Sequence, residues 1–419
     1  MRILWITNTI FPAPSLALNL PIPVFGGWMY GLAMQIAKAQ DNQLSVATTY
    51  KGSTFKKMEV DGVIYYLLPA KSQVSQKHLE PLWQKVCDEF RPDLVHIHGT
   101  ENTHGLACMS ACPTMNYIVS IQGLIGVISK YYYGNICKWN IFKNITFRDI
   151  VRFDTIFQTK KEFKKRGIFE KEYLLRTKHV IGRTSWDFAH VKLNNPKLNY
   201  HFCNESLRDC FYRNRKWSIN EKKNYTIFIS QANYPIKGLH QVIKAISFLI
   251  NDFPEIQVRV AGKDMVSRKN MTEQIKRRGY GSYLGNLIKK LGLEKHIQFI
   301  GTLTGEEMVN EYLNAHVYIC SSIIENSPNS LGEAQILGVP CIATYVGGIP
   351  DMVVNLESGL LYRFEEVEML AENIRKIFTD EALANHLSLN GIKAAEKRHD
   401  FVQNFERTIE IYKNVLNNN

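Results

Sequence analysis

The sequence predicts an α/β protein of two doubly wound domains that face a central cleft, and three observations lead there. The chain of 419 residues is too long for a single domain with one ordinary hydrophobic core and has the length of two domains. Short runs rich in Val, Ile and Tyr alternate with helix-length segments, as in parallel sheets covered on both faces. The alternation breaks between about residues 194 and 223, where NNPKLN and WSINEKKN indicate a joint.

Each predicted strand is a short, nearly continuous apolar run. In a first domain, residues 1–205, the runs are 2–8, 44–50, 63–68, 93–99, 116–123 and 179–184. In a second domain, residues 206–396, they are 225–230, 257–262, 297–301, 317–322 and 340–345. Residues 397–419 are predicted as a C-terminal helix because apolar residues recur from Phe401 to Val415 at helical spacing. This helix either closes the second domain or returns to the first.

Composition excludes several classes of protein. Hydrophobic residues make up 45% and charged residues 21%, which is incompatible with wholesale disorder. The eight cysteines form no CxxC pair, which favours reduced thiols. MRILWITN is too short for a signal sequence, and no stretch approaches the roughly 20 apolar residues of a membrane span. We therefore expect a cytoplasmic protein.

The net charge of +12 is concentrated between residues 138 and 183, a segment that contains thirteen Lys and Arg but only five Asp and Glu. Aromatic residues such as Trp139 and Phe142 are interleaved with them. The segment suits a solvated helical face, or a surface for anionic lipid or an anionic acceptor. Nucleic-acid binding is a third option, but no nucleic-acid module motif supports it, and we predict no such partner.

Polar and glycine motifs follow the predicted strands, where ligands bind in open α/β sheets. Gly26 and Gly27 precede a helix and suit the close approach of an anion. Lys237 follows the first strand of the second domain, where a fixed cation suits a diphosphate. Gly347 and Gly348 mark another amide-lined turn. No GxGxxG and no GxxxxGK[ST] occurs in these loops.

The stretch IIENSPNSLGEAQILGVP places Glu325 and Glu333 after a predicted strand. Asn329 or Ser330 is predicted to cap a helix that ends at Gly338, with Glu333 in its first turn. The amides near Ser330 and Leu331 would then bind a phosphate, and Glu333 would accept hydrogen bonds from a vicinal diol.

His96 and His98 are weak metal candidates in DLVHIHG, because no third ligand stands at suitable spacing. Histidines with hydrogen-bond partners beside the cleft explain them better, and we predict no metal site and no cofactor.

Together these residues resemble the retaining glycosyltransferases of family 4, which have two Rossmann-like domains in the GT-B fold. The resemblance rests on the Glu325-x7-Glu333 pair within ENSPNSLGEAQILGVPCIATYVGGIPDMV, on Lys237-Gly238 and on the C-terminal helix. In the first half, Gly26-Gly27, DLVHIHG and HVIGRTSWD match the family's pattern less closely.

The resemblance implies a role for each matched residue and no metal. Glu333 would hold the ribose of a nucleotide-sugar donor, and Glu325 the transferred sugar. Lys237 would neutralise the leaving diphosphate. The remaining donor-binding residues would be Asn329, Ser330, Leu331, Gly26, Gly27, Gln122, Gln231 and Arg183.

Two positions depart from the family's pattern. Gln231 stands where many members carry Arg, so the diphosphate has one cation fewer, and Arg183 is a candidate to compensate. Gln122 stands where many members carry His; it can donate to a sugar oxygen but cannot transfer a proton at neutral pH.

The resemblance implies transfer of a sugar, with retention, to a hydroxyl of a lipid-linked or growing surface polysaccharide such as capsule or lipopolysaccharide. The enzyme would be cytoplasmic, with possible peripheral contact with the anionic inner face of the cell membrane. The alternatives are a nucleotide-sugar epimerase of the same fold and a glycoside hydrolase that uses Glu325 and Glu333 as acid and base. A third alternative is a binding module without catalysis, in which the basic, aromatic segment docks on polyanions.

Overall fold

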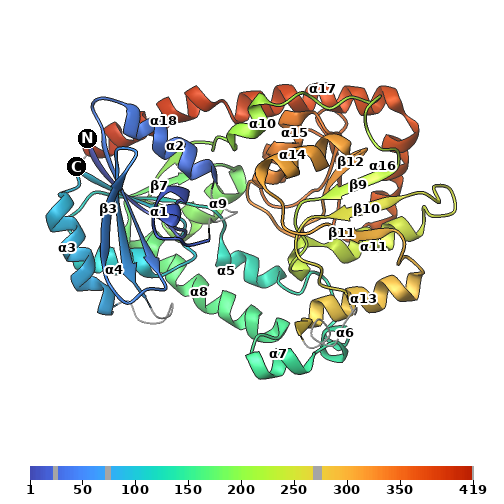
Figure 1. The fold of residues 1–419 in the computed structure, drawn as a ribbon, viewed down its shortest axis with the longest axis horizontal. Coiled ribbons are helices and arrows are strands. Elements are labelled where there is room, and N and C mark those ends of the chain that lie inside the picture. The colour runs from blue at the N-terminus through green and yellow to red at the C-terminus, as the bar shows by residue number, and fades with distance from the viewer. Residues whose placement is uncertain (22–26, 71–76, 268–275, 418–419) are drawn as a thin grey trace. The chain divides into compact units, whose positions relative to one another are not determined.

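The computed structural model describes residues 1–21, 27–70, 77–267 and 276–417, and the chain divides into two compact units (Figure 1). Unit 1 comprises Met1–Val127, Lys164–Arg208 and His399–Asn419, and unit 2 comprises Ile128–Phe163 and Asp209–Arg398. The sequence placed a boundary after residue 205 and another after residue 396, close to two of these divisions. The structure differs in assigning residues 128–163 to unit 2.

Unit 1 is built on a sheet of strand order β3-β4-β2-β1-β5-β6-β7-β8, parallel except for β3, which runs antiparallel to β4. Its strands are β1 (Arg2–Ile6), β2 (Gln43–Tyr50), β3 (Lys56–Val60), β4 (Val63–Pro69), β5 (Leu94–His98), β6 (Tyr117–Ser120), β7 (His179–Gly182) and β8 (Asn199–Phe202). Its helices are α1 (Pro12–Ala17), α2 (Gly27–Lys38), α3 (Glu80–Phe90), α4 (His104–Ala111), α9 (Ser185–Asn194) and α18 (Phe401–Asn417), with a 3₁₀ turn at Lys77–Leu79.

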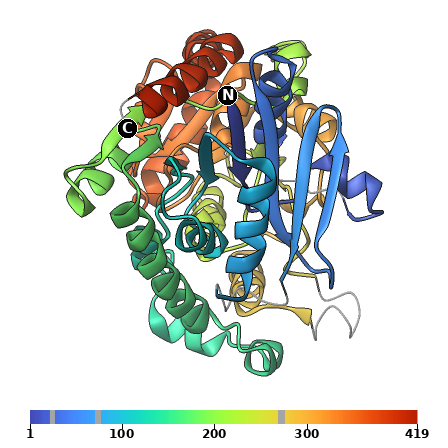
Figure 2. The same ribbon diagram turned by 90° about the vertical axis from the view of Figure 1, so that its left-hand side faces the viewer.

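The alternation of side chains along β1 divides the core of unit 1 between the two faces of the sheet. Leu4 and Ile6 lie in a cluster with α3 and α4, and Figure 2 shows α3 lying across this face. Ile3 and Trp5 lie in the opposite cluster, with α2 and α18. The C-terminal helix α18 therefore packs in unit 1, where the Trp5 indole donates a hydrogen bond to Tyr412 Oη at 3.0 Å.

Unit 2 is built on a parallel sheet of order β11-β10-β9-β12-β13-β14. Its strands are β9 (Thr226–Ile229), β10 (Gln257–Val260), β11 (Ile297–Phe299), β12 (Val317–Cys320), β13 (Cys341–Thr344) and β14 (Leu360–Tyr362). Its helices are α6 (Lys138–Lys143), α7 (Phe147–Arg152), α10 (Asp209–Arg213), α11 (Leu239–Ser247), α13 (Gly279–Leu291), α14 (Gly305–Asn314), α15 (Asn329–Leu337), α16 (Val367–Thr379) and α17 (Glu381–Arg398), with 3₁₀ turns η2 (Ser129–Tyr131), η3 (Pro235–Lys237) and η4 (Ile349–Asp351). Helices α5 (Ile125–Ile128) and α8 (Ile156–Arg176) each contain residues of both units.

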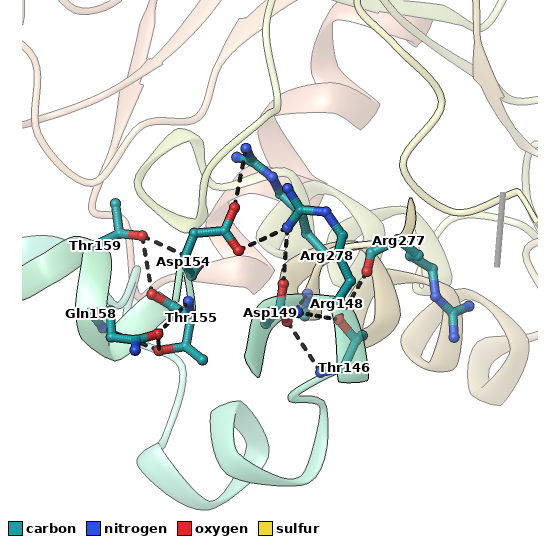
Figure 3. A network of polar contacts seen from close by, with 10 residues as sticks. Thr146, Arg148, Asp149, Asp154, Thr155, Gln158, Thr159, Arg277 and Arg278 are labelled. Atoms are coloured by element: carbon teal, nitrogen blue, oxygen red, sulfur yellow. Dashed lines mark hydrogen bonds and ion pairs between the residues drawn. The ribbon is translucent and has the colours of Figure 1, made fainter. Parts of the chain in front are cut away.

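Residues 128–163 pack in unit 2 because polar contacts join α7 to the start of α13 (Figure 3). The Asp149 carboxylate accepts a hydrogen bond from the Gly279 amide at 2.7 Å, and Thr146 Oγ1 donates to the Arg277 carbonyl at 2.9 Å. Asp149 is nearly fully buried and lies at the positive N-terminus of α13. These contacts link residues about 130 positions apart in the chain, which no local pattern reveals.

Within the described ranges, none of the helices combines the length and the apolarity that a membrane span requires.

Candidate active site

The loops after the two central strands of the unit 2 sheet, β9 and β12, bring Lys237 and Glu325 together. Lys237 ends η3, which follows β9, and Glu325 follows β12, the strand beside β9 in the sheet. Lys237 Nζ lies 2.5 Å from Glu325 Oε1, and the Ser322 hydroxyl donates to the same oxygen at 2.7 Å. Both charged side chains are about one-fifth exposed, so the ion pair is largely shielded from water yet reachable.

The environment keeps Lys237 charged. Burial opposes the charge of the ammonium, but the adjacent Glu325 carboxylate, through its charge and its hydrogen bond, raises the pKa of Lys237 above its ordinary value. A permanent cation at the carboxyl end of a parallel strand suits an anionic ligand such as a diphosphate.

The backbone around the pair is fixed by close packing. Gly238 has φ +72°, and a Cβ there would lie 1.8 Å from the Ser321 carbonyl oxygen. Gly347 has φ +53°, and a Cβ there would lie 1.9 Å from the Glu325 carbonyl oxygen, which also accepts a hydrogen bond from the Gly348 amide at 3.0 Å. Only glycine fits at either position, so the sequence-predicted Gly347-Gly348 turn holds the backbone of Glu325.

Helix α15 begins differently from the prediction. Its N-cap is Pro328, with no side-chain cap, so Asn329 and Ser330 are the first two helical residues rather than caps. Glu333 consequently lies in the second turn and not the first. The Leu331 amide bonds to the Pro328 carbonyl at 3.0 Å and is already satisfied. The helix ends at Gly338 with φ +83°, as the sequence predicted.

Two tyrosines hold the start of α15. Tyr318 Oη donates to Ser330 Oγ at 2.9 Å, and Tyr312 Oη donates to the Ser330 carbonyl at 2.8 Å. Glu333 is buried, with about 6% of its surface exposed. Gln231, which follows β9, is half-buried.

Two candidate residues of unit 1, Arg183 and Gln122, contact each other and Glu205. Arg183 is buried and pairs with Glu205, and its guanidinium also donates to the carbonyls of Ile121 and Gln122 at 2.9 and 3.0 Å. The Gln122 side-chain amide donates to Glu205 at 2.9 Å. Arg183 is therefore held by Glu205 and two backbone carbonyls, and its compensation for Gln231 stays a prediction. Glu205, which binds both Arg183 and Gln122, was not predicted from the sequence.

Gly27 begins α2, where a Cβ would lie 3.1 Å from the side chain of Arg208. Gly26 lies outside the described residues.

His96 and His98 are buried in unit 1. His96 contacts Tyr412 Oη at 2.5 Å and Ser120 Oγ at 2.6 Å, so both ring nitrogens have partners, as expected. His98 differs: neither of its ring nitrogens has a hydrogen-bond partner in the described part of the chain. Burial lowers the pKa of His98 to about 3, so it is neutral. The described residues contain no group of three His, Cys, Asp or Glu side chains arranged to hold a metal ion.

Ser321 and Ser322 are two further site residues that the sequence reasoning did not assign. Ser321 Oγ donates to the Lys237 carbonyl at 2.8 Å, and Ser322 orients Glu325. The sequence feature that could have identified them is their position at the end of the predicted run VYICSS, because polar residues at the carboxyl ends of parallel strands lie near ligands.

Comparisons with known proteins relate this chain to glycosyltransferases. Residues 213–394 match the model of glycosyl transferases group 1. The Bacillus subtilis protein named "Putative glycosyltransferase YtcC" is 25% identical over 369 residues, covering 86% of this chain and 81% of that protein. The capsular polysaccharide biosynthesis glycosyltransferase CapM of Staphylococcus aureus is 26% identical over 185 residues, 43% of each chain.

The fold is shared with solved structures. The crystal structure of Anabaena HepE in complex with UDP and glucose aligns over 99% of this chain and 100% of that one, with a TM-score of 0.66 at 15% identity. The two parallel-sheet units are therefore the two Rossmann-like domains of the GT-B fold. The epimerase and hydrolase alternatives gain no support from these similarities. The chain is a glycosyltransferase with the GT-B fold.

Proposed function

We propose that the chain is a retaining glycosyltransferase of family 4 that uses a nucleotide-diphosphate sugar as donor. The observation that carries this proposal is the Lys237–Glu325 ion pair at the carboxyl ends of two adjacent central strands. A similar fold holds UDP and glucose in HepE, which supports a nucleotide-sugar donor here.

The donor lies against unit 2 in this proposal. Lys237 contacts the diphosphate, and Glu325 contacts hydroxyls of the transferred sugar. The start of α15, at Asn329 and Ser330, faces the phosphates with the positive end of the helix dipole. Glu333 binds the ribose hydroxyls. Gly27 and Gln122 of unit 1 remain predicted donor contacts.

Catalysis rests on stabilising the leaving group. As the bond to the anomeric carbon breaks, negative charge grows on the diphosphate, and the fixed Lys237 cation stabilises that charge more than it stabilises the ground state. The acceptor hydroxyl attacks from the face that the diphosphate leaves, and a diphosphate oxygen takes its proton. We propose that no metal takes part.

The acceptor is proposed to be a lipid-linked or growing surface polysaccharide at the inner face of the cell membrane. The name of CapM, a capsular polysaccharide biosynthesis enzyme, supports an acceptor of this class.

A panel of nucleotide sugars, screened for thermal stabilisation of the whole protein, tests the donor. We expect one nucleotide sugar of the panel to raise the melting temperature of the wild type but not that of Glu333→Ala. The control Glu357→Ala, at an exposed site, should respond like the wild type. Stabilisation by no member of the panel contradicts the proposal. Once the product is available, the NMR coupling at its anomeric carbon tests retention, and an inverted configuration overturns it.

A further inference from the structure

We propose that the α6–α7 segment, residues 138–153, docks unit 2 on an anionic lipid surface by inserting aromatic side chains into its headgroup region. This deepens the membrane location proposed above, because it identifies the contact surface and the unit that carries it. Vesicle binding is independent of nucleotide-sugar binding, so the two proposals fail separately.

The first observation is a concentration of exposed apolar side chains. Six large ones in this segment are between 56% and 78% exposed: Trp139, Phe142, Phe147, Ile150, Val151 and Phe153. Exposed apolar groups of this size, close together in the chain, mark interaction surfaces in proteins. Trp and Phe are residue types that favour the membrane interface.

The second observation is the charge among these side chains. The segment carries Lys138, Lys143, Arg148 and Arg152 against one acid, Asp149, which is buried. Arg148 pairs with Asp149 and Asp154, whereas the described structure gives the other three cations no ion pair. Lys143 Nζ lies 4.8 Å from the centre of the Trp139 ring, so cation and aromatic face occur together. This combination suits anionic headgroups.

The third observation is that the inner side of the segment is rigidly held in unit 2. Figure 3 shows Asp149 and Thr146 bonded to one another and to the region of Arg277. The Asn286 side chain donates to Asn144 Oδ1 at 2.9 Å, and Ile141 is buried. The segment thus has a bonded inner side and an apolar outer side. The exposed aromatics are not the result of a loosely attached loop.

A lipid surface is favoured over a second copy of the chain because the segment is positive and the chain carries a net charge of +12, so like surfaces repel. The segment belongs to the same unit as the Lys237–Glu325 pair. Docking through this segment therefore holds unit 2, which carries the proposed donor site, at the membrane.

Co-sedimentation of the full-length protein with vesicles tests this. We compare phosphatidylcholine vesicles with vesicles containing about one-third phosphatidylglycerol, at low and high salt. We expect binding to the anionic vesicles, weakened by salt. The double variant Phe147→Ser/Phe153→Ser should lower the partition coefficient at least about tenfold, and Lys138→Gln/Lys143→Gln several-fold on anionic vesicles only.

Matched controls change similar residues elsewhere in unit 2. Leu389→Ser removes an apolar side chain of α17 that is 61% exposed, and Lys376→Gln/Lys397→Gln removes two exposed lysines. Both should bind like the wild type, and thermal melting confirms that every variant is folded. Equal binding by the Phe147→Ser/Phe153→Ser variant and the wild type overturns the proposal. So does self-association, measured by sedimentation velocity without lipid, that depends on these phenylalanines while vesicles are not bound.

Discussion

The ammonium of Lys237 and the carboxylate of Glu325 lie 2.5 Å apart, although the residues are 88 positions apart in the chain. Strands β9 and β12 are neighbours in the sheet, so the loops at their carboxyl ends converge. The pair therefore places a cation and a carboxylate side by side at the centre of this edge of the sheet.

Removing one member of this pair should destabilise the protein, because the other charge is left largely buried and unpaired. We expect Lys237→Ala and Glu325→Ala each to lower the free energy of unfolding in urea by about 1–3 kcal/mol, with a coupling of at least about 1 kcal/mol in the double-mutant cycle. The more exposed Arg375–Asp252 pair is the control and should couple by less than about 1 kcal/mol. Additive losses at Lys237 and Glu325 would contradict the account.

The tight turn after Lys237 predicts a large effect of one methyl group. Gly238 and Gly292 both have positive φ, at +72° and +66°, but only Gly238 has an atom, the Ser321 carbonyl oxygen, where a Cβ would go. Gly292→Ala should cost about 1 kcal/mol of unfolding free energy from backbone strain. Gly238→Ala should cost about 2 kcal/mol more, since the loop must move. Equal losses in chemical denaturation would show that the loop is not held as described.

Glu170 predicts a pH dependence of stability. Burial raises the pKa of this carboxyl from 4.5 to about 7, although it accepts hydrogen bonds from the amides of Ile125 and Gly126. Between these values the folded chain retains a proton that the unfolded chain has released, so the unfolding free energy falls by about 3 kcal/mol as pH rises through that window.

The variant Glu170→Gln lacks this titration. Its stability relative to the wild type should therefore improve between pH 5 and pH 8 in urea unfolding. The control Glu172→Gln, at a partly exposed carboxylate that pairs with Arg176, should run parallel to the wild type. A difference between Glu170→Gln and the wild type that stays constant with pH would refute this assignment.

The return of α18 to unit 1 predicts a role for one hydroxyl. Tyr412 Oη is buried and bonds to the Trp5 indole and to His96. Tyr412→Phe leaves both partners unsatisfied and should lower the unfolding free energy by about 1–3 kcal/mol. Tyr345→Phe, at an exposed site, should change it by less than about 0.5 kcal/mol. Equal stability of the two variants in thermal melting would count against this packing.

Apolar runs revealed every interior strand of both sheets but only one of the four edge strands, β11. Each of the eleven predicted runs coincides with a strand of the structure. In the described part of the chain, β3, β8 and β14 were missed, and each lies at the edge of its sheet. An edge strand is covered on fewer sides, so a sequence such as KKMEV in β3 needs no continuous apolar run.

Strand-end reasoning located Lys237, Glu325 and the Gly347 turn, but not the contacts among them. The pairing depends on which strands are neighbours, and the alternation of strands and helices does not determine that order. The sequence did not predict that residues 128–163 pack in unit 2 for a similar reason: the contact between Asp149 and Gly279 joins residues far apart in the chain. The start of α15 was misjudged locally: Pro328 takes the cap position that the sequence assigned to a polar side chain.

Calorimetric titration of the best-stabilising nucleotide sugar into the whole protein tests the central claim, that the Lys237–Glu325 pair and Glu333 form a donor site. The account predicts that Lys237→Ala and Glu333→Ala each weaken binding at least about tenfold, through loss of a charge-assisted hydrogen bond. The surface controls Lys376→Ala and Glu357→Ala should bind like the wild type. Unchanged affinity in both site variants, with the proteins folded, would contradict it.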